Sequence, residues 1–253
     1  VLAALGVYQG NEGVGGNVRP DSTITREEFA AVVVRLMDKE GTAKSLNTYV
    51  PNFTDANSIS SWAWGYVNVA SSLGVINGYP NGEFRPKNPV THAEVLAMLS
   101  RAVNVDKAAK GVWPLNYVVL GSSVGLDDGV DIVANVPATR GEVAIMTYNA
   151  YSVDQKWDSE DEKLVDRAGT YGSEETDNYF EATVESVSST EIKLEGLDGF
   201  EDYTDTYDWA ANAWVMGVDK LSDLVDLEVK VFLNDDDEVV AVVFDDEDVS
   251  IAT

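Results

Sequence analysis

The sequence predicts an α+β protein, with an N-terminal all-α bundle of three repeats followed by a small antiparallel β domain. Two observations support this prediction: a helix-turn-helix unit recurs through residues 1–153, and beyond residue 176 the hydrophobic period changes to two. Charge divides the chain in the same region. Residues 1–153 carry 11 basic and 14 acidic residues, whereas residues 154–253 carry 6 basic and 30 acidic residues. We therefore expect two domains of different character.

Composition excludes several classes of function. The 253 residues include no cysteine and one histidine, His92, which excludes thiolate metal sites and argues against Ser-His-Asp catalysis. A net charge of −27 argues against binding to nucleic acid or to anionic membranes. No apolar run reaches the roughly 18 residues that a membrane-spanning helix needs. We expect a protein that is not an enzyme and requires no cofactor.

The repeat has two conserved blocks along this one chain. In the first block, Tyr66–Gly78 aligns without a gap with Tyr117–Gly129, and Leu5–Gly10 aligns with its last six residues. In the second block, Val18–Ala30 aligns with Phe84–Leu96, while only the end of the block survives in the third copy. The predicted repeats are residues 1–41, which begin inside their first helix, residues 42–104, and a degenerate copy at residues 105–153.

Each copy is predicted to consist of a helix, a glycine-containing turn, a loop and a second helix. The first helix of the middle copy spans Ser60–Leu73 and ends at Gly74. Each second helix starts at a threonine N-cap with a glutamate three residues later, which is the spacing of a capping box. The three pairs are Thr25 with Glu28, Thr91 with Glu94, and Thr139 with Glu142. A lone hairpin cannot bury its apolar stripe, so the copies are expected to pack into a bundle with pseudo-threefold symmetry.

These motifs carry a family resemblance. The tripeptide Phe53–Asp55, the helix with Trp62 and Trp64, the segment Gly74–Pro86 and the helix start T-R/H-x-E together resemble the surface-layer homology (SLH) domain. The resemblance covers residues 1–153 and is strongest in the second copy. It implies a bacterial protein at the cell surface or in the surface layer, anchored non-covalently by binding pyruvylated secondary polymers of the cell wall.

The resemblance also implies which residues bind the wall polymer. They are Thr25, Arg26 and Glu28 in the first copy, His92 in the second, and Thr139, Arg140 and Glu142 in the third. Trp62 and Tyr79 are further candidates because aromatic rings can stack on sugar rings, and Gly78 is included beside Tyr79. An arginine just after an N-cap can donate two hydrogen bonds to a carboxylate. A histidine is mostly uncharged at pH 7, so we expect the groove at His92 to be weaker. The alternative is structural: the threonines and glutamates cap helices, the arginines pair with carboxylates, and the aromatic residues pack in the core.

The second half is predicted to begin with an acidic linker at residues 154–175, containing a short helix near residues 160–168. The acidic β domain follows at residues 176–253, with five or six strands in an antiparallel sheet or partly open barrel. Strands are predicted around residues 180–184, 192–194, 227–233 and 239–244, with a hairpin loop at 234–238 and one helical turn at 221–225.

Acidic runs in this half suggest a metal hypothesis. Asp235, Asp237, Asp245 and Asp246 offer the oxygen ligands that Ca²⁺ prefers, although their spacing is not that of an EF-hand. The alternative is a solvated acidic surface whose self-repulsion divalent ions relieve.

Three functions remain open from the sequence. The first is a surface-layer or envelope-anchored structural protein, with wall polysaccharide and other copies of itself as partners. The second is an extracellular lattice or filament subunit whose repeats pack against other subunits without binding glycan, with edge strands of the acidic sheet pairing between chains. The third is a glycosidase with two carboxylates, for which so acidic a chain gives no specific signal.

Overall fold

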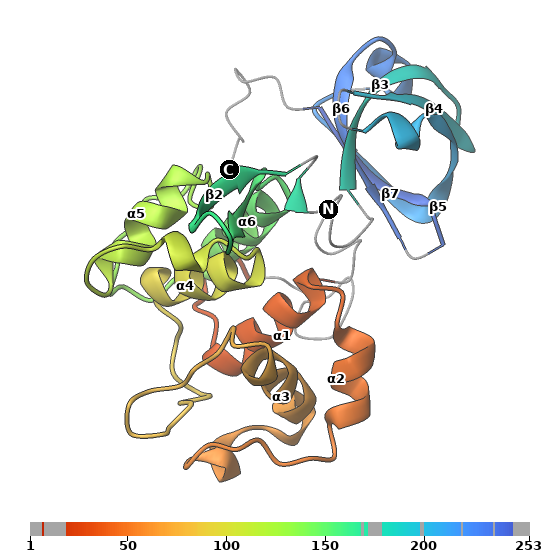
Figure 1. The fold of residues 1–253 in the computed structure, drawn as a ribbon. Coiled ribbons are helices and arrows are strands. Elements are labelled where there is room, and N and C mark those ends of the chain that lie inside the picture. The colour runs from red at the N-terminus through yellow and green to blue at the C-terminus, as the bar shows by residue number, and fades with distance from the viewer. Residues whose placement is uncertain are drawn as a thin grey trace. The chain divides into compact units, whose positions relative to one another are not determined.

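A computed structural model describes residues 7, 19–167, 170–171, 179–197, 200–218, 220–234 and 236–244, and the structural statements below concern these residues. The chain divides into two compact units after Asp166 (Figure 1). The helical unit comprises residues 7–166, and the barrel unit contains the described residues from Arg167 onward. The α+β class is therefore confirmed, with the helices and the main sheet in separate units.

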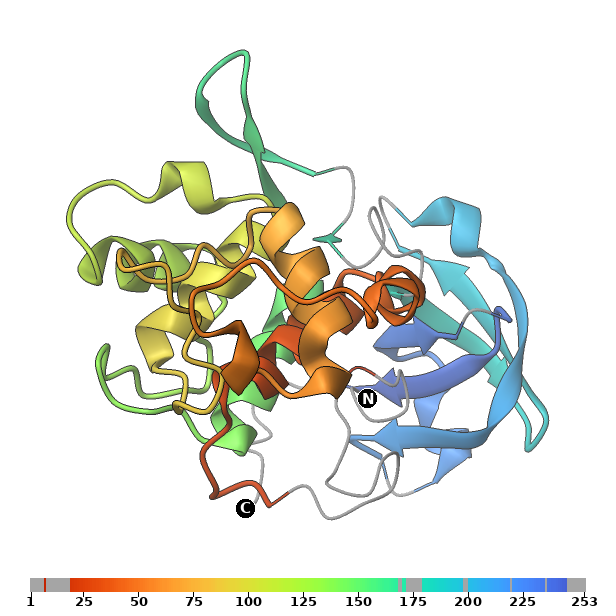
Figure 2. The ribbon, with the colours of Figure 1, turned by 90° about the horizontal axis from the view of Figure 1, so that it is seen from below.

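The described part of the helical unit contains six α-helices with short 3₁₀ turns between them (Figure 2). The α-helices are α1 (Arg26–Leu36), α2 (Glu40–Leu46), α3 (Trp64–Ser72), α4 (His92–Ala102), α5 (Leu115–Ser123) and α6 (Arg140–Tyr151). The 3₁₀ turns are η1 (Ala56–Ser58), η2 (Ser61–Ala63) and η3 (Asp106–Ala108). The predicted capping boxes are present at the start of α1, α4 and α6. Gly74 follows α3 with a φ of 73°, as a residue beyond a helix C-terminus requires.

The starts of α1, α4 and α6 connect the repeats to one another. The Arg26 N–H donates to Asn88 O at 3.0 Å, so α1 begins against the loop of the second repeat. The His92 N–H donates to Val136 O at 3.1 Å in the third repeat, and the Arg140 N–H donates to Ser22 O at 2.7 Å in the first. Because each helix uses an otherwise unpaired terminal N–H on the next repeat, the three segments close into a ring.

The apolar faces of these helices form the core inside the ring. Phe29, Val33 and Leu36 of α1 are fully buried, as are Leu96 and Leu99 of α4. All of them except Leu96 belong to the apolar helical stripes that the sequence predicts. At about 25 cal/mol per Å² of apolar surface, burial of these side chains is what holds short helices together.

The predicted linker helix is wrong. Strands β1 (Gln155–Asp158) and β2 (Lys163–Asp166) form an antiparallel hairpin that belongs to the helical unit. The turn is stabilised by Asp158 Oδ1, which accepts the N–H of Glu160 at 2.8 Å. The Trp157 N–H donates to Asn104 O at 2.8 Å, so a contact distant in sequence sets this conformation. Most of the remaining predicted linker lies outside the described residues.

The barrel unit is a closed five-stranded barrel in the order β3-β4-β5-β7-β6. Its strands are β3 (Tyr179–Val187), β4 (Glu191–Gly196), β5 (Asp205–Met216), β6 (Glu228–Leu233) and β7 (Val239–Val243), with turns η4 (Glu201–Tyr203) and η5 (Leu221–Leu224). Four strands, the β6–β7 hairpin and the turn at η5 match the prediction. The sequence missed β5, and the antiparallel prediction is wrong for one pair, because β5 and β7 run parallel.

Closure of the barrel bears on the lattice hypothesis. In the described strands, each of the five pairs with two neighbours, and buried Tyr179, Phe180 and Phe232 fill the interior. A closed barrel leaves few unpaired edge groups for a strand of another chain. The described strands of the barrel therefore offer few free edge groups for the expected pairing between copies. Among the described residues, no helix is both long and apolar enough to cross a bilayer.

Candidate functional site

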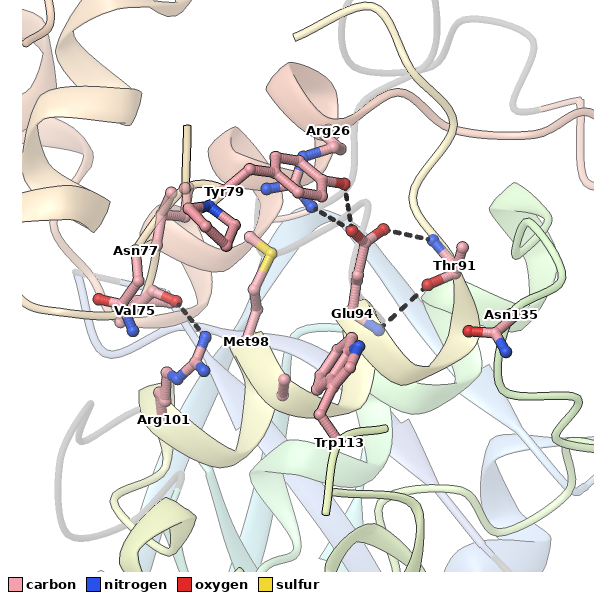
Figure 3. A pocket seen from close by; sticks show the side chains of 14 residues that line it. Arg26, Val75, Asn77, Tyr79, Thr91, Glu94, Met98, Arg101, Trp113 and Asn135 are labelled. Atoms are coloured by element: carbon pink, nitrogen blue, oxygen red, sulfur yellow. Dashed lines mark hydrogen bonds and ion pairs between the residues drawn. The ribbon is translucent and has the colours of Figure 1, made fainter. Parts of the chain in front are cut away.

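A cavity of about 400 Å³ lies along α4 in the helical unit (Figure 3). Its walls come from all three repeats: the start of α1, the loop after α3, the length of α4, and the segments before α5 and α6. The lining residues are Arg26, residues 75–80, Thr91, Glu94, Ala97, Met98, Arg101, Trp113 and Asn135. Two guanidinium groups, two aromatic rings and two side-chain amides thus share one cavity.

The loop that forms one wall is built by the F-T-D and G-Y-P-N-G-E-F-R-P segments. The Asp55 carboxylate accepts the N–H of Phe84 and the N–H of Arg85, both at 2.8 Å. Gly78 has a φ of 67°, and a Cβ there would lie 2.7 Å from the Phe53 ring. Only glycine fits at this position. These contacts hold the next residue, Tyr79, against the cavity.

Arg26 connects two repeats within the cavity wall. Its side chain is 7% exposed; Nε donates to Phe84 O at 2.8 Å, and Nη1 lies 2.9 Å from Glu94 Oε1. The Tyr79 ring lies 4.8 Å from the guanidinium, and its hydroxyl donates to Glu94. Burial raises the pKa of Tyr79, and the hydrogen bond to Glu94 raises it further. The charge of Arg26 is thus matched by Glu94.

Equivalent pairs occur at the other two seams between repeats. His92 Nε2 lies 3.2 Å from Glu142 Oε2, and Arg140 Nη1 lies 3.6 Å from Glu28 Oε1. His92 Nδ1 accepts the Val133 N–H at 3.1 Å. Burial alone would raise the pKa of Glu142, but the Thr139 N–H and His92 outweigh it and lower that pKa. The basic residue of each T-R/H-x-E motif therefore faces the capping glutamate of another repeat.

The structure brings only some of the predicted binding residues together. Arg26, Gly78 and Tyr79 line the cavity, whereas the other seven predicted residues do not. Those seven are Thr25, Glu28, Trp62, His92, Thr139, Arg140 and Glu142. His92 and Arg140 are 3% and 5% exposed, so their side chains lie inside the seams. Their binding to polymer stays a prediction.

The sequence reasoning missed Arg101 and Trp113. Arg101 Nη1 donates to Val75 O at 3.2 Å and Nη2 donates to the Tyr117 hydroxyl at 3.1 Å. Within the described part of the chain, Arg101 has no carboxylate partner. Trp113 is 50% exposed, and its ring contacts Tyr117 edge to face at 6.0 Å. The alignment of the repeats could have identified both residues, since Arg101 aligns with Arg35 and Trp113 aligns with Trp62.

Comparison with known proteins gives a family match over part of the chain. Residues 1–30 and 52–96 match the S-layer homology domain. This chain carries S-layer homology repeats. The match includes Arg26 and Gly78 to Glu94, so most of the cavity lies within S-layer homology sequence.

Several of the similar proteins are named as cell-wall, surface-layer or anchoring proteins, and others are named as enzymes, among them an amylopullulanase of Thermoanaerobacterium thermosulfurigenes. The chain is 39% identical over 153 residues to the middle cell wall protein of Brevibacillus brevis, covering 60% of this chain and 14% of the relative. It is 38% identical over 130 residues to the surface layer protein of Brevibacillus choshinensis, covering 51% and 11%. A cellulosome-anchoring protein of Acetivibrio thermocellus is 29% identical over 140 residues, covering 55% and 28%. The chain thus spans a small part of each relative.

The calcium hypothesis gains no support from the described residues. Of the four predicted ligands, Asp237 lies in the β6–β7 turn, while Asp235, Asp245 and Asp246 lie outside the described residues. Where the structure is described, no three acidic or histidine side chains gather closely enough to hold a metal ion. Calcium binding stays a prediction.

Proposed function

We propose that the helical unit anchors this protein non-covalently to the cell wall by binding an anionic, pyruvylated secondary polysaccharide in the α4 cavity. The observation that carries the proposal is the combination of guanidinium, aromatic and amide groups in one solvent-accessible cavity of about 400 Å³. Cavities of about 300–1,000 Å³ suit small ligands, so this one fits a short stretch of glycan. The S-layer homology match and the cell-wall relatives support the same role.

The chemistry of the lining suits an acidic sugar. Trp113 exposes half of its surface, and an exposed indole offers a flat apolar face to a sugar ring. Asn77 and Asn135 line the same cavity and supply amide groups that can bond hydroxyls. A guanidinium binds a carboxylate through two parallel hydrogen bonds, which fixes orientation as well as adding affinity.

The barrel unit has a separate role in this proposal. Residues 154–253 carry most of the negative charge of the chain, and acidic surfaces repel one another and anionic polymers. We therefore assign wall binding to the helical unit alone, with the barrel linking it to neighbouring subunits or further domains. The role proposed for this chain is adhesion rather than catalysis.

A matched pair of tryptophan variants tests the proposal. Trp62 and Trp113 occupy equivalent positions, contact Tyr66 and Tyr117 edge to face, and are 48% and 50% exposed, but only Trp113 lines the cavity. Binding to purified cell-wall sacculi is measured by co-sedimentation. We expect Trp113→Ala to weaken binding at least tenfold and Trp62→Ala to leave it unchanged.

Sacculi stripped of secondary polymer by acid provide the control for the ligand. The intact protein should bind native sacculi and lose that binding on stripped sacculi. Equal retention by both preparations, or equal binding by the two tryptophan variants, would refute wall anchoring through this cavity.

A further inference from the structure

We propose that Arg101 is the residue that receives the carboxylate of the ligand, and that Glu40 prevents the equivalent Arg35 from doing so. Of the three equivalent positions in the repeats of the described helical unit, only the one in the α4 cavity is then an anion-binding site. This inference rests on the proposed function and specifies how the same site selects its ligand.

The three positions are related by the repeat. Arg35, Arg101 and Asn149 are each the tenth residue of the helix that follows a capping box, in α1, α4 and α6. A residue at the same place in each repeat would be expected to face an equivalent groove. The side chain at this place, rather than the helix start, therefore distinguishes the three grooves.

The first two positions have the same aromatic support. Arg35 Nη2 donates to the Tyr66 hydroxyl at 3.0 Å, and Arg101 Nη2 donates to the Tyr117 hydroxyl at 3.1 Å. The guanidinium lies 4.9 Å from the Tyr66 ring in one case and 5.1 Å from the Tyr117 ring in the other. The two arginines are thus held in the same way by their tyrosines.

The carboxylate beside them differs. Arg35 Nε lies 2.8 Å from Glu40 Oε1, and Lys44 Nζ lies 3.0 Å from Glu40 Oε2. Burial opposes ionisation of Glu40, but hydrogen bonds from Tyr66, Arg35 and Lys44 outweigh it and lower the pKa of Glu40 to about 2. This carboxylate is ionised at every physiological pH. It forms with the guanidinium of Arg35 the ion pair that the carboxylate of an acidic ligand would otherwise form.

Arg101 has no such internal carboxylate among the described residues. Asp106 stands at the same offset after α4 as Glu40 does after α1, but it makes no ion pair with Arg101 in the described structure. Aspartate is one methylene shorter than glutamate, and it lies in the 3₁₀ turn η3 rather than in an α-helix. In the third repeat Asn149 carries no charge, and its amide donates to Asp128 O at 2.9 Å.

The cavity therefore has an excess positive charge. Arg26 is matched by Glu94, which leaves the charge of Arg101 unmatched among the lining residues. Two of the five guanidinium N–H groups donate to Val75 O and the Tyr117 hydroxyl, and the others have no partner in the described structure. A carboxylate on a sugar would satisfy both the charge and these donors.

Calorimetric titration with a pyruvylated monosaccharide glycoside and with its uncharged methyl ester tests the choice of Arg101. We expect one site per chain and at least tenfold weaker binding of the ester. Arg101→Gln should weaken binding of the acid at least tenfold, with Arg101→Lys between the two, whereas Arg35→Gln should bind as the intact protein does. Melting temperatures identify any variant that fails to fold. If Arg101→Gln does not fold, Arg101→Lys still tests the site, because it keeps the positive charge.

Glu40→Gln tests the second part, because it removes the internal carboxylate and should add a second acid-binding site at Arg35. A stoichiometry that stays at one would overturn the role given to Glu40. If ester and acid bind equally, or Arg101→Gln binds as tightly as the intact protein, the role of Arg101 is wrong. Wall anchoring is measured separately by co-sedimentation. If only the role of Arg101 is wrong, the protein should still bind sacculi through Trp113. If the proposed function itself is wrong, the protein should not sediment with sacculi at all.

Discussion

Arg26 Nη1 and Glu94 Oε1 lie 2.9 Å apart, although the two residues belong to different repeats. Glu94 also accepts the Thr91 N–H at 3.0 Å, so one carboxylate caps its own helix and pairs with the helix start of the preceding repeat. The same arrangement recurs with His92 and Glu142. The T-R/H-x-E motif therefore joins the repeats into a ring, whether or not a ligand is bound.

Replacement of Arg26 should open this seam. Arg26→Ala leaves Glu94 without its cation and Phe84 O without its donor, and breaking a buried ion pair costs about 3–5 kcal/mol. We expect a loss of about 3 kcal/mol in the free energy of unfolding, measured by urea denaturation. Lys44→Ala is the matched control, since the Lys44 side chain is 66% exposed and its surface pair with Glu40 contributes about 0.5 kcal/mol. Equal losses for the two variants would contradict the role of Arg26.

Asp55 should be required for the shape of the cavity wall. Asp55→Ala leaves the N–H groups of Phe84 and Arg85 without their acceptor, at a cost of about 2–3 kcal/mol. We expect lower stability by urea denaturation together with weaker binding to sacculi, because the loop that carries Tyr79 loosens. Asp106→Ala should change neither, as the Asp106 carboxylate has no hydrogen bond or ion pair in the described structure. An Asp55→Ala protein with intact stability would show that this clamp is dispensable.

The helix starts could be predicted from the sequence because their signal is local. A capping box needs only residues three apart, and all three, including Thr139 with Glu142, form as expected. The direction of the basic side chains could not be predicted in the same way. Arg140 and Glu28 are far apart in sequence, and only the closure of the ring brings them to 3.6 Å.

The remaining differences have the same physical origin. Charge alone indicated a linker at residues 154–175, but the contact of Trp157 with Asn104 O fixes a hairpin there. The parallel pairing of β5 with β7 depends on barrel closure, which no local period encodes. The local sequence does not show that Arg101 lacks a carboxylate partner among the described residues; this becomes visible when Arg101 is compared with Arg35, which pairs with Glu40.

Gly78 should tolerate no side chain. In Gly78→Ala the Cβ would lie 2.7 Å from the Phe53 ring and 3.0 Å from Glu83 O, in addition to the strain of a φ of 67°. We expect a loss of about 2–4 kcal/mol in unfolding free energy and weaker wall binding. Gly74→Ala separates the two causes, because its φ is 73° but no atom lies within 4 Å of the added Cβ. Backbone strain alone should cost Gly74→Ala about 1 kcal/mol, with wall binding retained. Similar losses of unfolding free energy for the two variants would show that the Phe53 ring moves aside at little cost.

Glu40 should make stability depend on pH in the acid range. Its pKa is lowered to about 2 in the folded protein from 4.5, so the unfolded chain binds the proton more tightly. The stabilisation is therefore complete above about pH 4.5 and is lost as the pH falls toward 2. Because the Glu40 side chain is 28% exposed and its partner Lys44 is 66% exposed, solvent screening reduces this contribution to about 1 kcal/mol. Urea denaturation of the intact protein and of Glu40→Gln should differ by about that amount at pH 7 and converge near pH 2. A difference that stays constant from neutral to acid pH would mean that the variant acts through packing, and that Glu40 does not hold Arg35 by its charge.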